Sequence, residues 1–227
     1  MINNCECEGC ELRSLFFNNV SATELISLCT IKIEKTFIKG ELIIEEGSEI
    51  EDFIYLKSGL VKLYRISDDE EQIITIAKPL DFVSLLSVFS NRHFKYSVRA
   101  LEDSVTCSLK IQYVKDLVKS NGNFALDLLE KMNRIADNII IESLEIRRKH
   151  LRGRIAHVLL YFADYIYSSH EFDLPISRKE IAEYIGMTTE NVIRTLSEFR
   201  KDKIIKINGK TIEIINKPML EKISALG

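Results

Sequence analysis

The sequence predicts an α+β protein with an antiparallel β-rich N-terminal half, one long central helix and a C-terminal helix-turn-helix. Three observations predict this order. Short β-rich runs recur between residues 31 and 109, residues 123–150 contain neither Pro nor Gly, and two short amphipathic patterns flank Gly186. We expect three domains, at residues 1–122, 123–150 and 151–227.

Composition indicates an ordinary globular protein. The 227 residues are 46% hydrophobic and 29% charged, and no apolar run approaches the length of a membrane span. The first residues are polar and acidic, so we expect no secretory signal and no membrane partner. Five cysteines are an odd number and form no disulfide framework, which favours reduced thiols and a cytoplasmic location.

The β-rich region predicts a compact antiparallel barrel or roll. A capping box of Ser21 and Glu24 first predicts a short helix at 22–29. Seven β-rich runs follow, separated by turn signals of the Gly, Pro and Asp type. The runs are residues 31–38, 41–46, 52–56, 59–66, 71–77, 96–101 and 104–109. Strands at this even spacing are typical of a small closed β-structure.

The long segment 123–150 predicts a helix that follows a shorter one at 111–119. Apolar or small residues recur at alternating spacings of three and four, which is the pattern of a dimer seam. They are Leu129, Met132, Ala136, Ile139, Ser143 and Ile146. Packing against the chain's own roll is the alternative. More apolar surface is present than one contact face uses, which favours a parallel homodimer; it comes from Ile135, Ile139, Ile140 and Ile141.

Residues 175–203 predict a helix-turn-helix. Ser177 and Glu180 form a capping box, Gly186 suits a turn with positive φ, and Thr188 caps the second helix. Val192 and Leu196 fall on the inner face of that helix. A glycine at the turn between two helices, followed by a β-branched residue on the inner face of the second helix, is typical of a DNA-binding module.

The other face of the second helix predicts contacts to double-stranded DNA. Arg194 can grip guanine with two hydrogen bonds, and Glu190 can accept one from cytosine. A surface ion pair between them, four residues apart, is the alternative. The candidate DNA-binding residues are Ser177, Arg178, Thr188, Thr189, Glu190, Asn191, Arg194, Ser197 and Lys210.

The residues around the motif support this interpretation. Residues 204–207 and 211–215 alternate around Asn208-Gly209, which predicts a hairpin and hence a winged helix-turn-helix. Lys206 and Lys210 would lie near phosphate. Residues 147–210 hold 13 basic and 8 acidic residues, a net charge of +5, whereas residues 1–146 hold 16 and 24, a net charge of −8. Positive charge therefore gathers on the segment expected to meet DNA.

The order of these parts resembles the CRP/FNR family of bacterial transcription regulators. The resemblance is carried by residues 39–64, 98–104 and 176–196 and covers nearly the whole chain. It implies a cyclic-nucleotide-binding-like β-roll, a long dimerisation helix, a homodimer and RNA polymerase as a partner. It also implies that Glu190 and Arg194 read a TGA-type half-site. Ile193 stands where the family often has Ser or Gly, and it could contact a thymine methyl instead.

The effector is less clear from the resemblance. Cyclic-AMP-binding members carry Phe-Gly-Glu and Arg-Ser segments, whose carboxylate and guanidinium hold the ribose and the phosphate. This chain has Phe82-Val83-Ser84 and Phe94-Lys95 at these places, so cyclic AMP is not expected. We expect Phe82, Ser84 and Lys95 to line whatever effector pocket exists.

The cysteines resemble those of the FNR-like branch, which implies a [4Fe–4S] cluster that senses oxygen or nitric oxide. The implied ligands are Cys5, Cys7, Cys10 and Cys107. The spacing C-x-C-x-x-C is tighter than the family's, so Cys29 could replace one ligand. Zinc, inert thiols and a haem on His93 are alternatives.

An enzyme is not expected, because no phosphate loop, His-Glu metal motif or nucleophile elbow occurs in the sequence. A ligand-binding module whose helix-turn-helix contacts only protein is the other alternative. Steep salt dependence of binding to random duplex would favour DNA.

Overall fold

The computed structural model describes residues 20–68, 70–84 and 86–227. The chain divides into two compact units, one of residues up to 65 with 74–138 and one of residues 66–73 with 139–227. Each unit is described by itself below.

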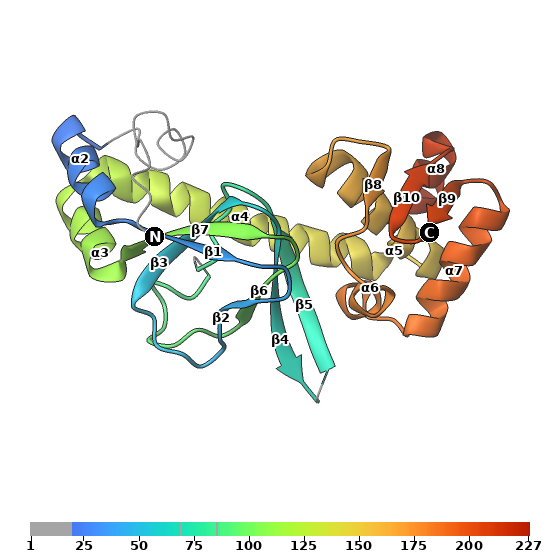
Figure 1. Cartoon of the computed structure of the whole chain (residues 1–227), viewed down its shortest axis with the longest axis horizontal. Helices are drawn as coiled ribbons and strands as arrows, with labels where there is room; N and C mark the ends of the chain where they lie inside the picture. The colour runs from blue at the N-terminus through green and yellow to red at the C-terminus, as the bar shows by residue number, and fades with distance from the viewer. Residues whose placement is uncertain (1–19, 69, 85) are drawn as a thin grey trace. The chain divides into compact units, whose positions relative to one another are not determined.

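The N-terminal unit is a β-roll built from two antiparallel sheets (Figure 1). One sheet has the strand order β1-β7-β3 and the other has the order β2-β6-β4-β5. The strands are β1 (Ile33–Phe37), β2 (Leu42–Ile44), β3 (Asp52–Ser58), β4 (Val61–Ser67), β5 (Glu70–Ala77), β6 (Ser97–Ala100) and β7 (Ser104–Lys110). The expected α+β fold with an antiparallel roll is confirmed.

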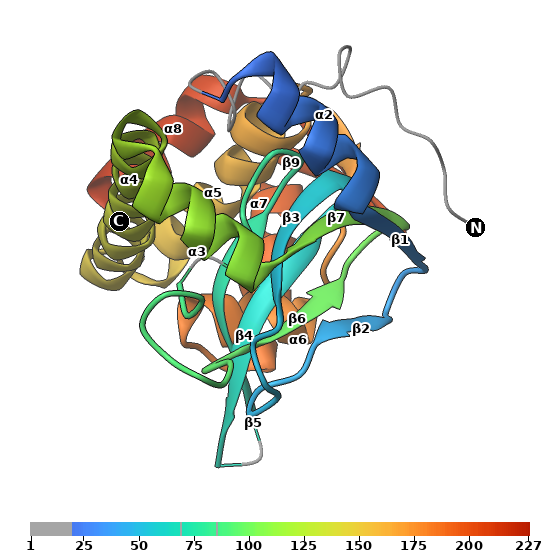
Figure 2. The ribbon, with the colours of Figure 1, turned by 90° about the vertical axis from the view of Figure 1, so that its left-hand side faces the viewer.

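Alternating side chains of these strands form the core of the roll. Phe53, Val61, Leu63 and Val98 are almost fully buried and belong to one apolar cluster. Two helices, α2 (Ala22–Ile31) and α3 (Ile111–Ser120), lie at one end of the roll (Figure 2). The capping box at Ser21 forms as expected, because Ser21 Oγ accepts from the Glu24 N–H and Glu24 Oε2 accepts from the Ser21 N–H.

The long helix α4 (Gly122–Arg148) packs one face against the roll and leaves another exposed. Phe124 and Leu128 are buried in the roll core, and Met132 packs against it. Two positions of the expected seam therefore contact the chain itself, Met132 on the roll and Ile146, which is buried, and the seam stays a prediction. The roll supplies apolar partners that the heptad pattern alone does not reveal. The large apolar residues that remain exposed on α4 are Leu126, Leu129, Ile140, Ile141 and Leu144.

The C-terminal unit combines helices with a small sheet of order β8-β10-β9. Its elements are α5 (Leu151–Leu160), η2 (Tyr161–Ile166), β8 (Glu171–Asp173), α6 (Arg178–Ile185), α7 (Thr189–Lys201), β9 (Ile205–Asn208), β10 (Thr211–Ile214) and α8 (Lys217–Leu226). Helix α5 continues directly into the π-helical η2.

No helix in the described part of the chain is both long and apolar enough to cross a membrane.

Candidate nucleic-acid interface

The helix-turn-helix is fixed by two caps and one left-handed glycine. Ser177 Oγ accepts a hydrogen bond from the Glu180 N–H at 3.1 Å, and Glu180 Oε2 accepts one from the Ser177 N–H at 2.8 Å. Gly186 ends α6 with φ 66° and ψ 53°, a conformation that glycine adopts without steric cost. Thr188 Oγ1 then accepts from the Asn191 N–H at 3.4 Å and starts α7. These contacts set the direction in which α7 leaves the turn.

The inner face of α7 anchors it in the unit. Val192, Leu196 and Phe199 are fully or almost fully buried. From α5, the guanidinium of Arg152 lies over the Phe199 ring at 5.0 Å and forms an ion pair with Glu198. Because one face of α7 is buried by packing, the opposite face is exposed and available to contact a ligand.

The outer face of α7 carries the residues predicted to read bases. Glu190, Ile193, Arg194 and Ser197 are all exposed, and Ile193 retains 51% of its accessible surface. Arg194 Nη2 donates to Asn191 Oδ1 at 3.0 Å, and among the described residues no ion pair joins it to Glu190. The face therefore presents a carboxylate, a guanidinium and an apolar side chain together.

Glu190 is held in its charged form. Its own backbone N–H and the Thr188 hydroxyl lower the pKa of the Glu190 carboxyl, and the first turn of a helix also favours an anion. The carboxylate is consequently available as a hydrogen-bond acceptor near neutral pH.

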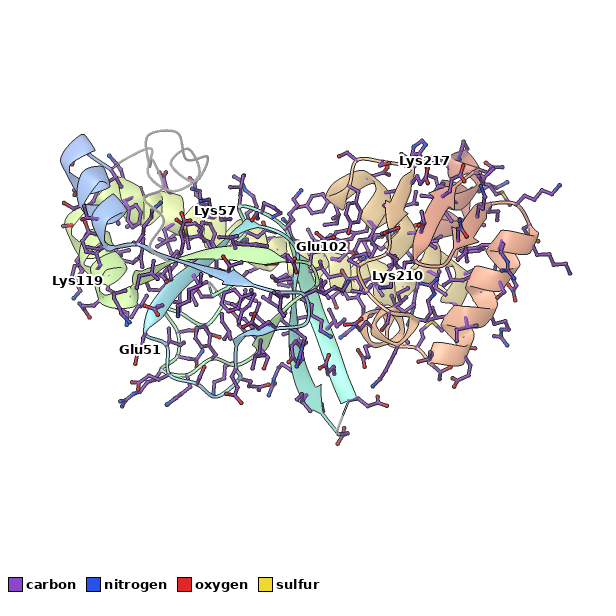
Figure 3. All side chains as sticks on the ribbon, viewed as in Figure 1. Glu51, Lys57, Glu102, Lys119, Lys210 and Lys217 are labelled. Atoms are coloured by element: carbon purple, nitrogen blue, oxygen red, sulfur yellow. The ribbon has the colours of Figure 1, made fainter. Side chains whose placement is uncertain are left out.

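The hairpin after α7 places positive charge at its turn. Strands β9 and β10 pair from Asn208 opposite Thr211, and Gly209 in the turn has φ 63°. Lys210, labelled in Figure 3, is exposed beside this turn. Lys206 donates to Glu213 at 3.1 Å, so part of its charge is neutralised locally. Lys210 is thus better placed than Lys206 to offer a net charge to phosphate.

The nine predicted DNA-binding residues all lie on the C-terminal unit, but they differ in availability. The hydroxyls of Ser177 and Thr188 serve as helix caps, and Thr189, Asn191 and Arg178 are half-buried. Sequence reasoning left out Arg200 and Lys201, which are exposed in the last turns of α7. Lys201 follows Arg194 by seven residues, a same-face helical spacing that could have found it, whereas Arg200 at a spacing of six has no such signal.

The three predicted effector residues do not share one environment. Phe82 is buried in the roll core, with its ring centroid 5.6 Å from that of Phe53. Ser84 is fully buried, and its hydroxyl accepts from the Ile54 N–H at 2.8 Å. Lys95 is exposed. The Ser84 hydroxyl therefore attaches its loop to β3. An effector role for the three residues stays a prediction.

The described cysteine that could bind a metal lies in a buried charged cluster. Cys107 is fully buried, and its thiol lies 3.5 Å from Glu34 Oε1. Lys57, labelled in Figure 3, donates to the two oxygens of Glu34 at 2.9 and 3.0 Å, and Lys32 donates at 3.4 Å. Burial, with Glu34 beside it, raises the pKa of the Cys107 thiol to about 11.

Without a bound metal, this environment favours the protonated form of Cys107. A metal binds the thiolate, and both burial and the adjacent carboxylate disfavour that form of Cys107. Cys5, Cys7 and Cys10 lie outside the described residues. Within the described ranges, no three His, Cys, Asp or Glu side chains are grouped to hold a metal ion, and His93 is an exposed loop residue.

Comparison with known proteins agrees with both halves of the fold. Residues 34–121 match the model of the cyclic nucleotide-binding domain, and residues 153–223 match that of the Crp-like helix-turn-helix domain. The fumarate and nitrate reduction regulatory protein of Escherichia coli K12 is 27% identical over 225 residues, covering 96% of this chain and 90% of the relative. The regulatory protein HlyX of Actinobacillus pleuropneumoniae is 28% identical over 215 residues, covering 92% and 89%.

Solved structures share the fold. FixK2 from Bradyrhizobium japonicum superposes with a TM-score of 0.76 at 24% identity, covering 85% of this chain and 97% of that one. A transcriptional regulator of the crp/fnr family from Eubacterium rectale gives 0.77 at 21% identity, covering 92% and 97%. These relatives are named as regulatory proteins and not as enzymes. With a roll of the cyclic-nucleotide-binding type and a Crp-like helix-turn-helix, the chain belongs to the CRP/FNR family of DNA-binding transcription regulators.

Proposed function

We propose that this regulator reads DNA with the outer face of α7. The observation that carries the proposal is the exposed group of Glu190, Ile193 and Arg194 on a helix whose other face is locked by packing. Arg194 would donate to guanine O6 and N7, and Glu190 would accept from cytosine N4. Asn191, which bonds Arg194 at 3.0 Å, would hold the guanidinium in position before contact.

Phosphate contacts would fix the register of the helix in the groove. The Ser177 cap leaves the N-terminus of α6 at the surface, where backbone N–H groups and Arg178 favour an anion. Lys210 on the wing and Arg200 at the end of α7 are exposed cations. These contacts carry no sequence information but supply affinity that falls with salt.

The test compares Arg194→Ala with wild type on two duplexes, one selected by the wild type and one scrambled. Loss of a bidentate base contact should weaken binding to the selected duplex by about 1–3 kcal/mol and leave the scrambled duplex nearly unchanged. Lys222→Ala, which removes an exposed cation from α8, is the matched control and should change neither. Equal losses on both duplexes would make Arg194 a phosphate contact and contradict the base-reading role.

The protein is proposed to act as a homodimer joined along α4. The exposed apolar residues Leu126, Leu129, Ile140 and Leu144 fall on one face at helical spacing. A helix that leaves such a face in water has a strong drive to associate, and a two-fold pair would present two copies of α7. RNA polymerase as a further partner stays a prediction from the family resemblance.

An iron–sulfur cluster is a second candidate for the sensing function. Relatives named for fumarate and nitrate reduction regulation and the N-terminal Cys5, Cys7 and Cys10 support it. Cys107 as fourth ligand would place the cluster beside Glu34, whose Oε1 lies 3.5 Å from the thiol. A small-ligand sensor without a cluster is the alternative, and cyclic AMP is not favoured for it.

Iron and sulfide content after anaerobic purification separates these candidates. About four irons per chain, lost in Cys10→Ala and in Cys107→Ala, would support a four-cysteine cluster. Iron retained in Cys107→Ala would exclude Cys107 from the ligand set. A colourless protein without iron would favour the small-ligand sensor.

A further inference from the structure

A carboxylate of the long helix joins two other helices of the C-terminal unit. Glu142 Oε1, on α4, lies 2.8 Å from His157 Nε2 of α5 and accepts from the Tyr184 hydroxyl of α6 at 3.4 Å. The three residues are far apart in sequence and come together on one oxygen. We call this group the Glu142 clasp.

The clasp is sheltered from water. Tyr184 is 8% exposed, and the side chains of Glu142 and His157 are 25% and 22% exposed. Burial, followed by the Glu142 charge, raises the pKa of the Tyr184 hydroxyl well above its usual value, so it remains a donor. The contact to His157 requires a proton on Nε2. The His157 contact, at 2.8 Å from a charged acceptor, has the length of a charge-assisted hydrogen bond, whereas the Tyr184 contact at 3.4 Å is longer and weaker.

A second set of bonds supports the same joint. The Arg154 guanidinium on α5 donates to the carbonyls of Arg147 at 3.1 Å, Lys149 at 2.8 Å and Ile185 at 2.9 Å. Ile185 is the last residue of α6, next to the turn of the helix-turn-helix. The C-terminal end of α4 is therefore tied to α6 at two places, through Glu142 and through Arg154.

The position of α6 decides the position of α7. The two helices are joined at Gly186, and the buried faces of α6 and α7 leave little freedom between them. Any bond that fixes α6 on α4 consequently fixes the reading face of α7 on α4 as well. In a dimer joined along α4, the same bond would set the separation of the two reading faces.

We propose that Glu142, His157 and Tyr184 are positioning residues for DNA recognition, and that they set which half-site spacing the dimer accepts. The inference rests on the proposed DNA-reading role of α7 and on the dimer. None of the three residues lies on the outer face of α7, so they act through geometry rather than through base contact.

The test is a series of duplexes in which two inverted half-sites, selected by the wild type, are separated by spacers changed one base pair at a time. Wild type should prefer one spacing sharply. Glu142→Ala and Tyr184→Phe should reduce the preference for that spacing over its neighbours by about fivefold or more, while binding to a single half-site is unchanged. Because both bonds share one oxygen, the double variant should resemble Glu142→Ala.

Tyr165→Phe is the matched control, since it removes a hydroxyl from a 47% exposed tyrosine in the same unit. It should keep the wild-type spacing profile. A wild-type profile in Glu142→Ala and Tyr184→Phe would overturn the positioning role. An equal loss on every duplex, single half-sites included, would indicate a merely structural role and would also overturn it.

A measurement without DNA separates this inference from the proposed function. Bioorthogonal labels at Arg148 on α4 and Ser197 on α7, both exposed and both in the C-terminal unit, report the distance between these helices within one chain when labelled dimers are diluted with unlabelled protein. The distance distribution should be narrow in wild type and broader in Tyr184→Phe. Identical distributions would overturn the clasp, whereas a wild type that binds no DNA would overturn the proposed function alone.

Discussion

At the residue scale, Gly59 and Gly40 share one backbone conformation but differ in how closely other atoms approach them. Both have φ of 89°, which residues with a Cβ rarely adopt. A Cβ on Gly40 would meet nothing within 4 Å, but one on Gly59 would lie 2.7 Å from Cα of Ser104. The sequence shows that both positions are glycine. It does not reveal that β7 approaches one of them, because that contact is distant in the chain.

Replacement of these two glycines by alanine should therefore differ in cost. Gly40→Ala should lower the free energy of unfolding by about 1–2 kcal/mol through backbone strain. Gly59→Ala adds a backbone clash and should cost about 3 kcal/mol or more. Urea unfolding of both variants measures the difference, and equal costs would contradict the close approach at Gly59.

Ile193 is the apolar member of the reading face. It is 51% exposed on α7, with Arg194 beside it and Ser197 one turn later. Exposure of a single large apolar side chain is ordinary by itself. If the outer face of α7 reads a duplex as proposed, Ile193 would have a chemical match in the C5-methyl group of thymine.

A methyl-deletion experiment tests this match. Deoxyuridine in place of thymine, at the base pair that Ile193 contacts, should weaken wild-type binding by about 0.5–1 kcal/mol, because one buried methyl group is lost. Ile193→Ala should bind both duplexes with equal affinity. A wild type insensitive to every thymine-to-uracil change in the half-site would contradict the contact.

At the element scale, α4 shows what a heptad pattern can and cannot specify. Its length and continuity were predictable, and the helix runs from Gly122 to Arg148. The sequence holds two apolar faces at similar spacing, and the roll decides which one is buried. Met132 packs on the roll core, while Ile140 and Leu144 remain 57% and 59% exposed.

Charges on the exposed face should separate the proposed dimer. Ile140→Glu combined with Leu144→Glu places two like charges from each subunit in an apolar contact, so it should shift the protein to a monomer. Asn138→Glu adds a charge to another exposed side of α4 and should stay dimeric. Sedimentation velocity across a concentration series measures both, and a dimer that persists in the double variant would place the interface elsewhere.

The other helices and strands differ in whether a short sequence pattern predicts them. The caps at Ser177 and Thr188 and the hairpin around Gly209 were predictable because short-range contacts define them. The helix α8 was missed although Asn216 caps it, by accepting from the Met219 N–H at 3.1 Å. Strand β8 has three residues and exists through its pairing with β10, a contact that no local pattern announces.

The residues of the candidate site also differ in whether the sequence could predict their arrangement. The exposed face of α7 was predictable from helical spacing. The Glu142 clasp was not, because it joins three helices that only the tertiary fold brings together. The state of Cys107 was also hidden, since its neighbour Glu34 comes from a distant strand whose register places the two residues opposite each other.

At the scale of the whole molecule, net positive and net negative charge lie on different parts of the chain. Residues 147–210 carry a net charge of +5 and include the reading helix and the wing, whereas residues 1–146 carry −8 and include the roll. The overall charge of −3 conceals this division. A cationic reading unit attached to an acidic unit would favour DNA approach through one surface.

Selection of binding sites from a random duplex library by the full-length protein tests the central claim most directly, since it depends on the reading face of α7 and on the pairing of subunits together. The account predicts enrichment of inverted repeats whose half-site centres lie about one helical turn, roughly 10–10.5 base pairs, apart. Enrichment of a single unsymmetrical site, or no enrichment above the starting library, would contradict it.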